Sequence, residues 1–291
     1  MKKKMIALLL SITAMVSCAF GFSACQGGNP PESSGGDGSS PVDSSSPGED
    51  TAIEAKDDIE DFDYTLTETE CIITGVKDKK AKKIVIPDCV TSIADSAFEN
   101  CSSLVSVVIG VSVVSIGENA FCECYRLVEV INKSTYITVQ KGGEEHGGVG
   151  YYALAVYNSD SAVTESRLVR DGECIVYTEA AEKVLVGYTG TARSVVLPSY
   201  ITKINSRAFY DCDYLLAVVV GESVTSIGAY AFEECDSLES VTFNDTTTWY
   251  RTYDKEEWES KTGGEEVDLA DSERNAWLFY EVYFYYNFYK L

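Results

Sequence analysis

Apolar residues recur along this chain with a period of 23 residues. The segment Ile93–Leu104 carries an isoleucine, an Ala-Phe pair, a cysteine and a leucine, and Ile116–Leu127 repeats them in the same order. The same pair of segments returns at Ile204–Leu215 and Ile227–Leu238. After each leucine, apolar and other residues alternate, which is typical of a strand with one buried face. The Ala-Phe pairs suit a short helical turn on the opposite side of each coil.

A larger duplication includes these repeats. A shift of 111 residues lays 84–131 onto 195–242, and before each block two short apolar runs flank a polar turn, as in a hairpin. The duplicated blocks span 64–131 and 175–242. Between them, Val149–Leu154 matches Ile227–Phe232 position for position, which predicts a degenerate repeat near 149–157. We therefore predict one repeat region over 62–250, because a single coil cannot bury its own apolar residues whereas stacked coils can.

The repeats resemble a known family. Ser115–Leu127 and Ser226–Leu238 both follow the pattern SIGxxAFxxCxxL, which resembles the BspA-type (Treponema pallidum-type) leucine-rich repeat of bacterial surface proteins. The resemblance implies a leucine-rich-repeat solenoid, a right-handed and β-rich superhelix of 23-residue coils, here with two hairpin elaborations and a C-terminal cap. For function it implies less, since members are described as adhesins or host-protein binders and many have no known role.

The N-terminus is typical of an exported lipoprotein. A basic start at Met1–Lys4 precedes an apolar run that ends at Phe22–Cys25, a stretch that resembles the lipobox of bacterial lipoproteins. We predict a signal peptide over 1–24 and lipidation of Cys25, with Cys18 as the competing site. Residues 25–61 are rich in Gly, Ser, Pro and acid, which predicts a disordered tether. The expected location is the bacterial cell membrane or cell surface, through a lipid anchor.

The charge of the chain argues against some partners. It carries 23 basic and 46 acidic side chains, for a net charge of −23. A charge of this sign repels phosphate backbones and anionic lipid. We expect no nucleic-acid partner, and contact with a membrane only through the lipid anchor.

Candidate chemistry is sparse, and we predict that the protein is not an enzyme and needs no cofactor. The single histidine, His146, lies in a glycine-rich loop, whereas a catalytic base must be held rigidly. Cys122–Cys124 lacks a second pair of metal ligands, so no metal site is predicted. Four cysteines share one repeat position and should be small buried side chains: Cys101, Cys124, Cys212 and Cys235. The pairing of the other cysteines stays open.

Two candidate binding surfaces remain. The first consists of outward strand positions, which are mostly β-branched and carry little charge: Val85, Val108, Ile131, Val196, Val219 and Thr242. Such a surface suits a protein partner, because charged residues are depleted in interface cores. The second is aromatic and would stack on sugars: Trp249, Tyr250 and Trp258. We predict a cell-surface binding or adhesion module for an extracellular protein, with a carbohydrate-binding lipoprotein or a structural envelope protein as alternatives. The aromatic tail over 251–291 is predicted to cap the solenoid.

Overall fold

The computed structural model describes residues 55–245, 247–279 and 286–291. The predicted signal peptide, Cys25 and most of the predicted tether lie outside these residues. Within them, no helix is both long and apolar enough to span a membrane. The chain forms two compact units, which are described separately. Unit 1 contains residues 55–124 and 130–164, and unit 2 contains 125–129 and 165–291.

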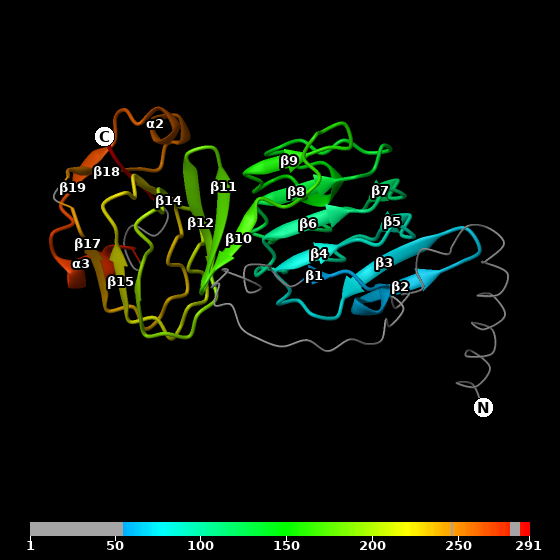
Figure 1. The fold of residues 1–291 in the computed structure, drawn as a ribbon, viewed down its shortest axis with the longest axis horizontal. Helices are drawn as coiled ribbons and strands as arrows, with labels where there is room; N and C mark the ends of the chain where they lie inside the picture. Colours follow the sequence, from blue (N-terminus) through cyan, green and yellow to red (C-terminus); the bar gives the residue numbers. More distant parts are fainter. Residues whose placement is uncertain (1–54, 246, 280–285) are drawn as a thin grey trace, which may run out of the picture. The chain divides into compact units, whose positions relative to one another are not determined.

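Unit 1 is built from two sheets of stacked strands (Figure 1). The first sheet has the order β1 (Ala55–Lys56), β4 (Lys83–Val85), β6 (Ser106–Ile109), β8 (Glu129–Asn132) and β9 (Ala155–Tyr157). The second has the order β2 (Phe62–Leu66), β3 (Cys71–Val76), β5 (Ser92–Ile93) and β7 (Ser115–Ile116). Strands β2 and β3 form the predicted antiparallel hairpin. Strand β3 pairs in parallel with β5, which in turn pairs in parallel with β7.

Regular structure begins earlier than residue 62, the predicted start of the solenoid. Strand β1 pairs in parallel with β4, with Ala55 opposite Lys83. A 3-10 turn, η2 (Ile59–Asp61), follows, and the Asp58 carboxylate accepts a hydrogen bond from the Glu60 N–H at its start. The polar composition of this segment did not predict a strand. Strand β1 forms nevertheless, because its backbone pairs with that of β4.

Unit 2 repeats this plan. Its smaller sheet has the order β13 (Ser194–Val196), β15 (Ala217–Val220) and β17 (Ser240–Phe243). Its larger sheet has the order β10 (Leu168–Asp171), β11 (Cys174–Glu179), β12 (Glu182–Tyr188), β14 (Lys203–Ile204), β16 (Ser226–Ile227), β20 (Asn287–Lys290), β18 (Trp249–Thr252) and β19 (Glu265–Val267). The predicted second hairpin is β11 with β12, and β10 adds an antiparallel strand that the sequence did not predict.

The 23-residue register is confirmed in both units. Ile84 lies opposite Val107, and Val218 lies opposite Val241. The coil phenylalanines are fully buried and stack in pairs. The ring centroids are 4.9 Å apart in Phe98–Phe121 and also in Phe209–Phe232.

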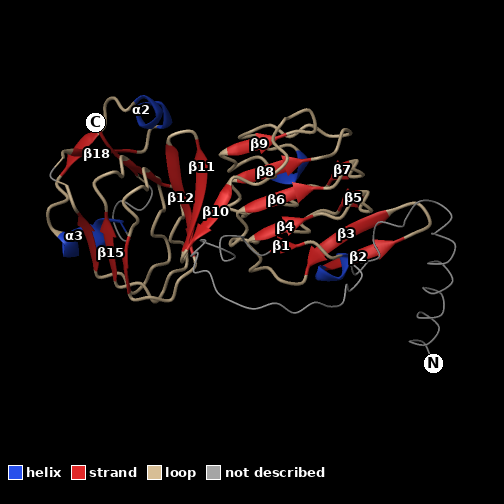
Figure 2. Ribbon diagram, viewed as in Figure 1, coloured by secondary structure: helices blue, strands red, loops and turns tan. Residues whose placement is uncertain are grey.

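The Ala-Phe segments form tight turns, and none of these is an α-helix in the described chain (Figure 2). A backbone ladder between coils holds them: Phe98 N–H donates to Ala120 O over 2.8 Å, and Phe209 N–H donates to Ala231 O over 2.8 Å. The coils approach so closely at Gly117 that an added Cβ would lie 2.5 Å from the Asp95 nitrogen. Glycine is needed at this corner because its neighbour is backbone.

The C-terminal segment from β18 onward packs against the last coil of unit 2, and we call this segment the cap; the sequence placed its start at residue 251. Helices α2 (Lys255–Ser260) and α3 (Ser272–Trp277) lie between its strands. The Phe279 ring packs 5.4 Å from Phe232 in the last coil and 4.5 Å from Phe288 in β20. The apolar end of unit 2 is therefore closed by aromatic side chains.

Candidate functional site

The predicted outward residues of unit 1 are not an exposed surface. Val108 is only 6% exposed and Ile131 only 3%, while Val85 is half-buried. All four residues of β6 and all four of β8 are buried. The prediction that Val108 and Ile131 face solvent is therefore wrong.

The strand order of the sheet accounts for this burial. Strands β6 and β8 are internal strands, so each outward side chain has neighbours on both adjacent strands. Glu129, the first residue of β8, is also buried and is held by hydrogen bonds. The Glu129 carboxylate accepts hydrogen bonds from Ser166 Oγ at 2.6 Å and from the Arg167 N–H at 2.7 Å.

In unit 2 the same positions are accessible. Val196 is 68% exposed, Thr242 is exposed and Val219 is half-buried between them. The strand register places Val196 opposite Val219 and Val219 opposite Thr242. A second column on the same face is also in register, with Ser194 opposite Ala217 and Ala217 opposite Ser240. We call these two columns together the strand face: Ser194, Ala217, Ser240, Val196, Val219 and Thr242.

The predicted aromatic site is largely taken up by the cap. Trp249 is 2% exposed, its Nε1 donates to Asp245 Oδ1 at 3.4 Å, and its ring lies 5.1 Å from Phe243. Tyr250 stacks on Tyr289 with centroids 5.6 Å apart. A buried indole cannot stack on a sugar, so the prediction fails at Trp249. The side chain of Trp258 lies outside the described part of the chain.

Three of the four repeat cysteines are buried thiols, as expected, and Cys212 is half-buried. Cys124 Sγ donates to Phe98 O at 3.2 Å, and Cys235 Sγ donates to Phe209 O at 2.9 Å. The hydrogen bond with Cys101, followed by burial, raises the pKa of the Cys124 thiol. The Cys124 thiol therefore stays protonated, which suits packing rather than metal ligation. In the described ranges, no group of three or more His, Cys, Asp or Glu side chains is placed to hold a metal ion.

The degenerate repeat exists, but its register differs from the predicted one. In regular coils, the residue two before the phenylalanine has a left-handed backbone, as at Asn119 (φ 54°), and His146 has the same φ of 54°. Phe121 N–H donates to Gly147 O at 2.9 Å, as Phe98 N–H donates to Ala120 O. Gly147 and Gly148 therefore stand where other coils carry Ala-Phe. Leu154, which was matched to the phenylalanine, lies further along the coil.

This coil is also longer than the others. Asn119 lies 23 residues after Ser96, whereas His146 lies 27 residues after Asn119. The additional length lies before His146, in a loop that contains Gly142–Glu145. A 3-10 turn, η3 (His146–Gly148), follows this loop. An added Cβ at Gly148 would meet nothing within 4 Å, so the side of the coil is open at the place of the missing phenylalanine.

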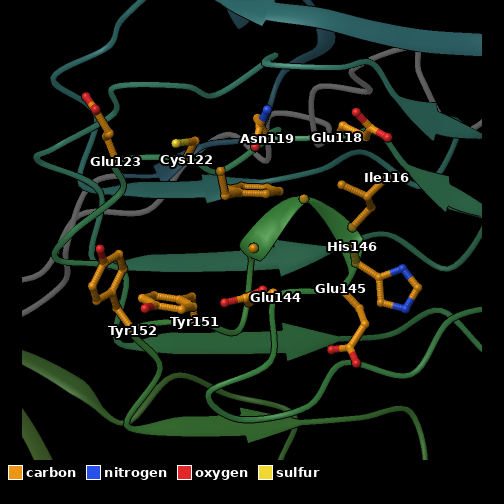
Figure 3. Close-up of a pocket in the computed structure, with 14 residues that line it drawn as sticks. Ile116, Glu118, Asn119, Cys122, Glu123, Glu144, Glu145, His146, Tyr151 and Tyr152 are labelled. Atoms are coloured by element: carbon orange, nitrogen blue, oxygen red, sulfur yellow. The ribbon is translucent and has the colours of Figure 1, made fainter.

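A cavity of about 610 Å³ lies at this opening, entirely within unit 1 (Figure 3). We call it the coil cavity. Figure 3 shows two facing rows of side chains, one from the coil of Phe121 and one from the longer coil. Glu118, Asn119 and Glu123 belong to the first row, and Glu144 and Tyr151 to the second.

The coil cavity combines negative charge with aromatic rings. It is lined by four glutamates, namely Glu118, Glu123, Glu144 and Glu145, and by no lysine or arginine. None of these carboxylates makes an ion pair with another described residue. Tyr151 is 48% exposed, and its ring meets that of Tyr152 edge to face at 4.7 Å.

Sequence reasoning missed this cavity because it treated His146 and its glycines only as a loop. A signal was present, however. The four extra residues and the absence of an Ala-Phe pair between residues 121 and 208 mark one coil as different from its neighbours.

Comparison with known proteins identifies the repeats. The family model of the BspA type leucine rich repeat region matches residues 76–142 and 187–256, in six copies. These ranges contain the four regular 23-residue repeats, and the degenerate repeat predicted near 149–157 lies between them. No match was found among curated proteins.

Several solved structures are also similar. A leucine-rich repeat protein of T. pallidum is 24% identical, with 64% of this chain and 71% of that chain covered and a TM-score of 0.28. A leucine-rich cell surface protein of Faecalibacterium prausnitzii is 17% identical, with 70% and 77% covered and a TM-score of 0.28. The pneumococcal vaccine antigen PcpA is 16% identical, with 56% and 51% covered and a TM-score of 0.31.

Proposed function

Because this chain belongs to the BspA-type leucine-rich repeat proteins, we propose that it is a protein-interaction module on a bacterial cell surface, and that the strand face is its binding surface. The observation that carries the proposal is the in-register column of Val196, Val219 and Thr242, which is open to solvent in unit 2. This column is the part of the predicted surface that remains accessible.

The chemistry of the strand face favours a protein partner. None of its six residues is charged, so little desolvation of charge opposes contact. Neighbouring strands lie about 4.8 Å apart, so three strands make a rigid ridge about 10 Å long. A flat, partly apolar ridge matches the composition of a protein interface core better than it matches a sugar or an anion.

The test uses purified extracellular-matrix proteins and bacterial surface proteins as immobilised ligands, with the chain in solution. The double variant Val196→Lys with Thr242→Lys should remain folded, because both side chains are exposed, and should lose affinity for the ligand that binds. Val114→Lys is the matched control, since Val114 is 51% exposed but lies in unit 1. If the double variant binds as tightly as the wild type, the strand face is not the binding surface.

The alternative is a carbohydrate-binding lipoprotein, and a glycan array examines it directly. Tyr250 is half-buried and remains a candidate ring for stacking. Sugar binding that is lost in Tyr250→Ala and kept in the strand-face variant would favour this alternative. A chain that binds neither proteins nor glycans would support a structural role in the envelope.

We further propose that the chain is exported and anchored by a lipid on Cys25, a residue outside the described part of the chain. The support is the lipobox-like sequence Phe22–Cys25 and the polar stretch that follows it. The variant Cys25→Ser should move the protein from the membrane fraction to the soluble fraction and should not incorporate labelled palmitate. Continued labelling would assign the anchor to Cys18 or to another site.

A further inference from the structure

We propose that the coil cavity binds a basic side chain, lysine or arginine, presented by a protein partner. That the basic side chain belongs to a protein rests on the protein-interaction function proposed above. The recognition of a cation is argued separately, from the charge, the rings and the shape of the cavity.

The charge of the cavity is the first argument. Four glutamates line it, no lysine or arginine does, and the carboxylates have no cationic partner among the residues described. An ammonium or guanidinium group fits this lining, because it is positively charged and only donates hydrogen bonds, whereas the carboxylates are negatively charged and only accept them. A neutral sugar would leave the negative charge uncompensated.

The aromatic wall is the second argument. Tyr151 and Tyr152 lie in the same row as Glu144, and the side chain of Tyr151 is 48% exposed. A cation over the face of a tyrosine is attracted by the quadrupole of the ring. The aliphatic part of a lysine or arginine can pack on the same ring while its head group reaches a carboxylate.

The origin of the cavity is the third argument. The ladder bond from Phe121 N–H to Gly147 O shows that the longer coil stacks normally, yet its Ala-Phe pair is replaced by Gly147-Gly148. The opening is therefore a local replacement within a regular stack and not a defect of coil register. Its volume of about 610 Å³ lies in the range of ligand pockets, roughly 300–1,000 Å³.

The experiment measures affinity for the peptide Ac-Gly-Lys-Gly-Arg-Gly-NH₂ by calorimetry on the mature chain. The matched probe carries norleucine and citrulline in place of lysine and arginine, so that it keeps the length but loses both charges. The basic peptide should bind and the neutral peptide should not. Added salt should weaken the binding, because a charge attraction is screened.

Variants locate the site. Glu118→Gln with Glu144→Gln keeps the shape of two exposed side chains and should lower the affinity about tenfold or more. Tyr151→Leu should lower it less. The control Glu68→Gln with Glu70→Gln removes the same charge from the exposed β2–β3 turn and should leave affinity unchanged. Thermal melting must show that all variants are folded.

Several outcomes would overturn the proposal. Equal loss in the control would mean that net charge alone attracts the peptide, and equal binding of the neutral peptide would mean that the charge is irrelevant. Binding of neutral oligosaccharides in place of the basic peptide would assign the cavity to sugars. The strand-face variant separates the two proposals, because it should still bind the peptide even where it has lost its protein ligand.

Discussion

One phenylalanine per regular coil lies at the centre of each unit. Phe209 is fully buried, stacks on Phe232 and lies 5.6 Å from the ring of Tyr188. Both of these ring contacts are made by other strands or coils, so removal of the Phe209 side chain would leave a cavity that the close-packed stack closes only in part.

The variant Phe209→Ala should therefore lower the free energy of unfolding by about 3–5 kcal/mol. Urea denaturation measures this, with Tyr214→Ala as the control, because Tyr214 is exposed and should change stability by less than about 0.5 kcal/mol. A cost below about 1 kcal/mol for Phe209→Ala would contradict the packing described for the coil.

Each regular coil also contains residues with a left-handed backbone that are not glycine. Asn100 is an exposed example with φ 63°, at the turn that follows Phe98. Asparagine tolerates this conformation, whereas a β-branched residue clashes with its own backbone there.

We expect Asn100→Val to lower the free energy of unfolding by roughly 1–2 kcal/mol, while Asn100→Gly should change it little. The comparison of the two variants by denaturation separates backbone strain from the loss of the side chain. Equal effects would show that the asparagine side chain, and not φ, is what matters.

A pH-dependent contribution comes from Lys261, which ends helix α2 and lies 5.2 Å from the ring centroid of Tyr289. Burial first, and then the charge of Lys203, lowers the pKa of Lys261 to about 8. An unfolded lysine has a pKa of about 10.4, so between these values the unfolded chain binds more protons than the folded one. This residue therefore makes stability rise with pH in that window.

The variant Lys261→Met should remove that part of the rise. The measurement is the difference in unfolding free energy between variant and wild type at about pH 7 and about pH 9.5, where the variant should gain more at the lower pH. A difference that does not change with pH would mean that Lys261 keeps its ordinary pKa in the folded protein.

At the scale of elements, alternation and repeat spacing predicted the strands and both hairpins. They did not predict the two-residue strands β5 and β7 that extend the first hairpin into a sheet, because two residues such as Ser92–Ile93 carry no detectable alternation. The register of the degenerate coil was wrong for a related reason. Gly148 stands at the phenylalanine position of this coil, so an alignment based on apolar residues matched Leu154 to the phenylalanine of the other coils.

The cap is fastened to unit 2 by a buried polar side chain. Asn275 in α3 is fully buried, and its Nδ2 donates to Val241 O and to Leu269 O, both at 2.8 Å. Asparagine thus joins the last strand of the solenoid to the loop before the helix.

We expect Asn275→Leu to lower stability by about 1–3 kcal/mol, because two buried carbonyl groups lose their donor. Denaturation measures the loss, and limited proteolysis should show faster cleavage within the cap. Unchanged stability would indicate that the aromatic contacts of Phe279 are sufficient to hold the cap in place.

At the scale of the whole molecule, the sequence distinguished inward from outward residues but did not show which outward residues are covered. Strand alternation treats Val108 and Val196 alike, yet one is buried and the other exposed. Val108 lies on β6, an internal strand of its sheet, whereas Val196 lies on β13, an edge strand, and no short pattern encodes the strand order. The coil cavity escaped prediction because it arises from absent side chains.

The excess of acidic side chains leads to a prediction for the complete chain. With a net charge of −23, it should show no measurable affinity for double-stranded DNA even at low salt, since both molecules are anionic. A gel-shift titration measures this, and a shifted band that disappears with added salt would contradict it.

The longer coil of unit 1 has a consequence for how such a protein can change. Four residues have been accommodated before His146 while the bond from Phe121 N–H to Gly147 O is retained, so this corner can lengthen without loss of stacking. Selection can therefore diversify the loop around Gly142–Glu145 independently of the scaffold, much as hypervariable loops diversify on a fixed framework. The same tolerance makes this loop a natural position for a grafted epitope.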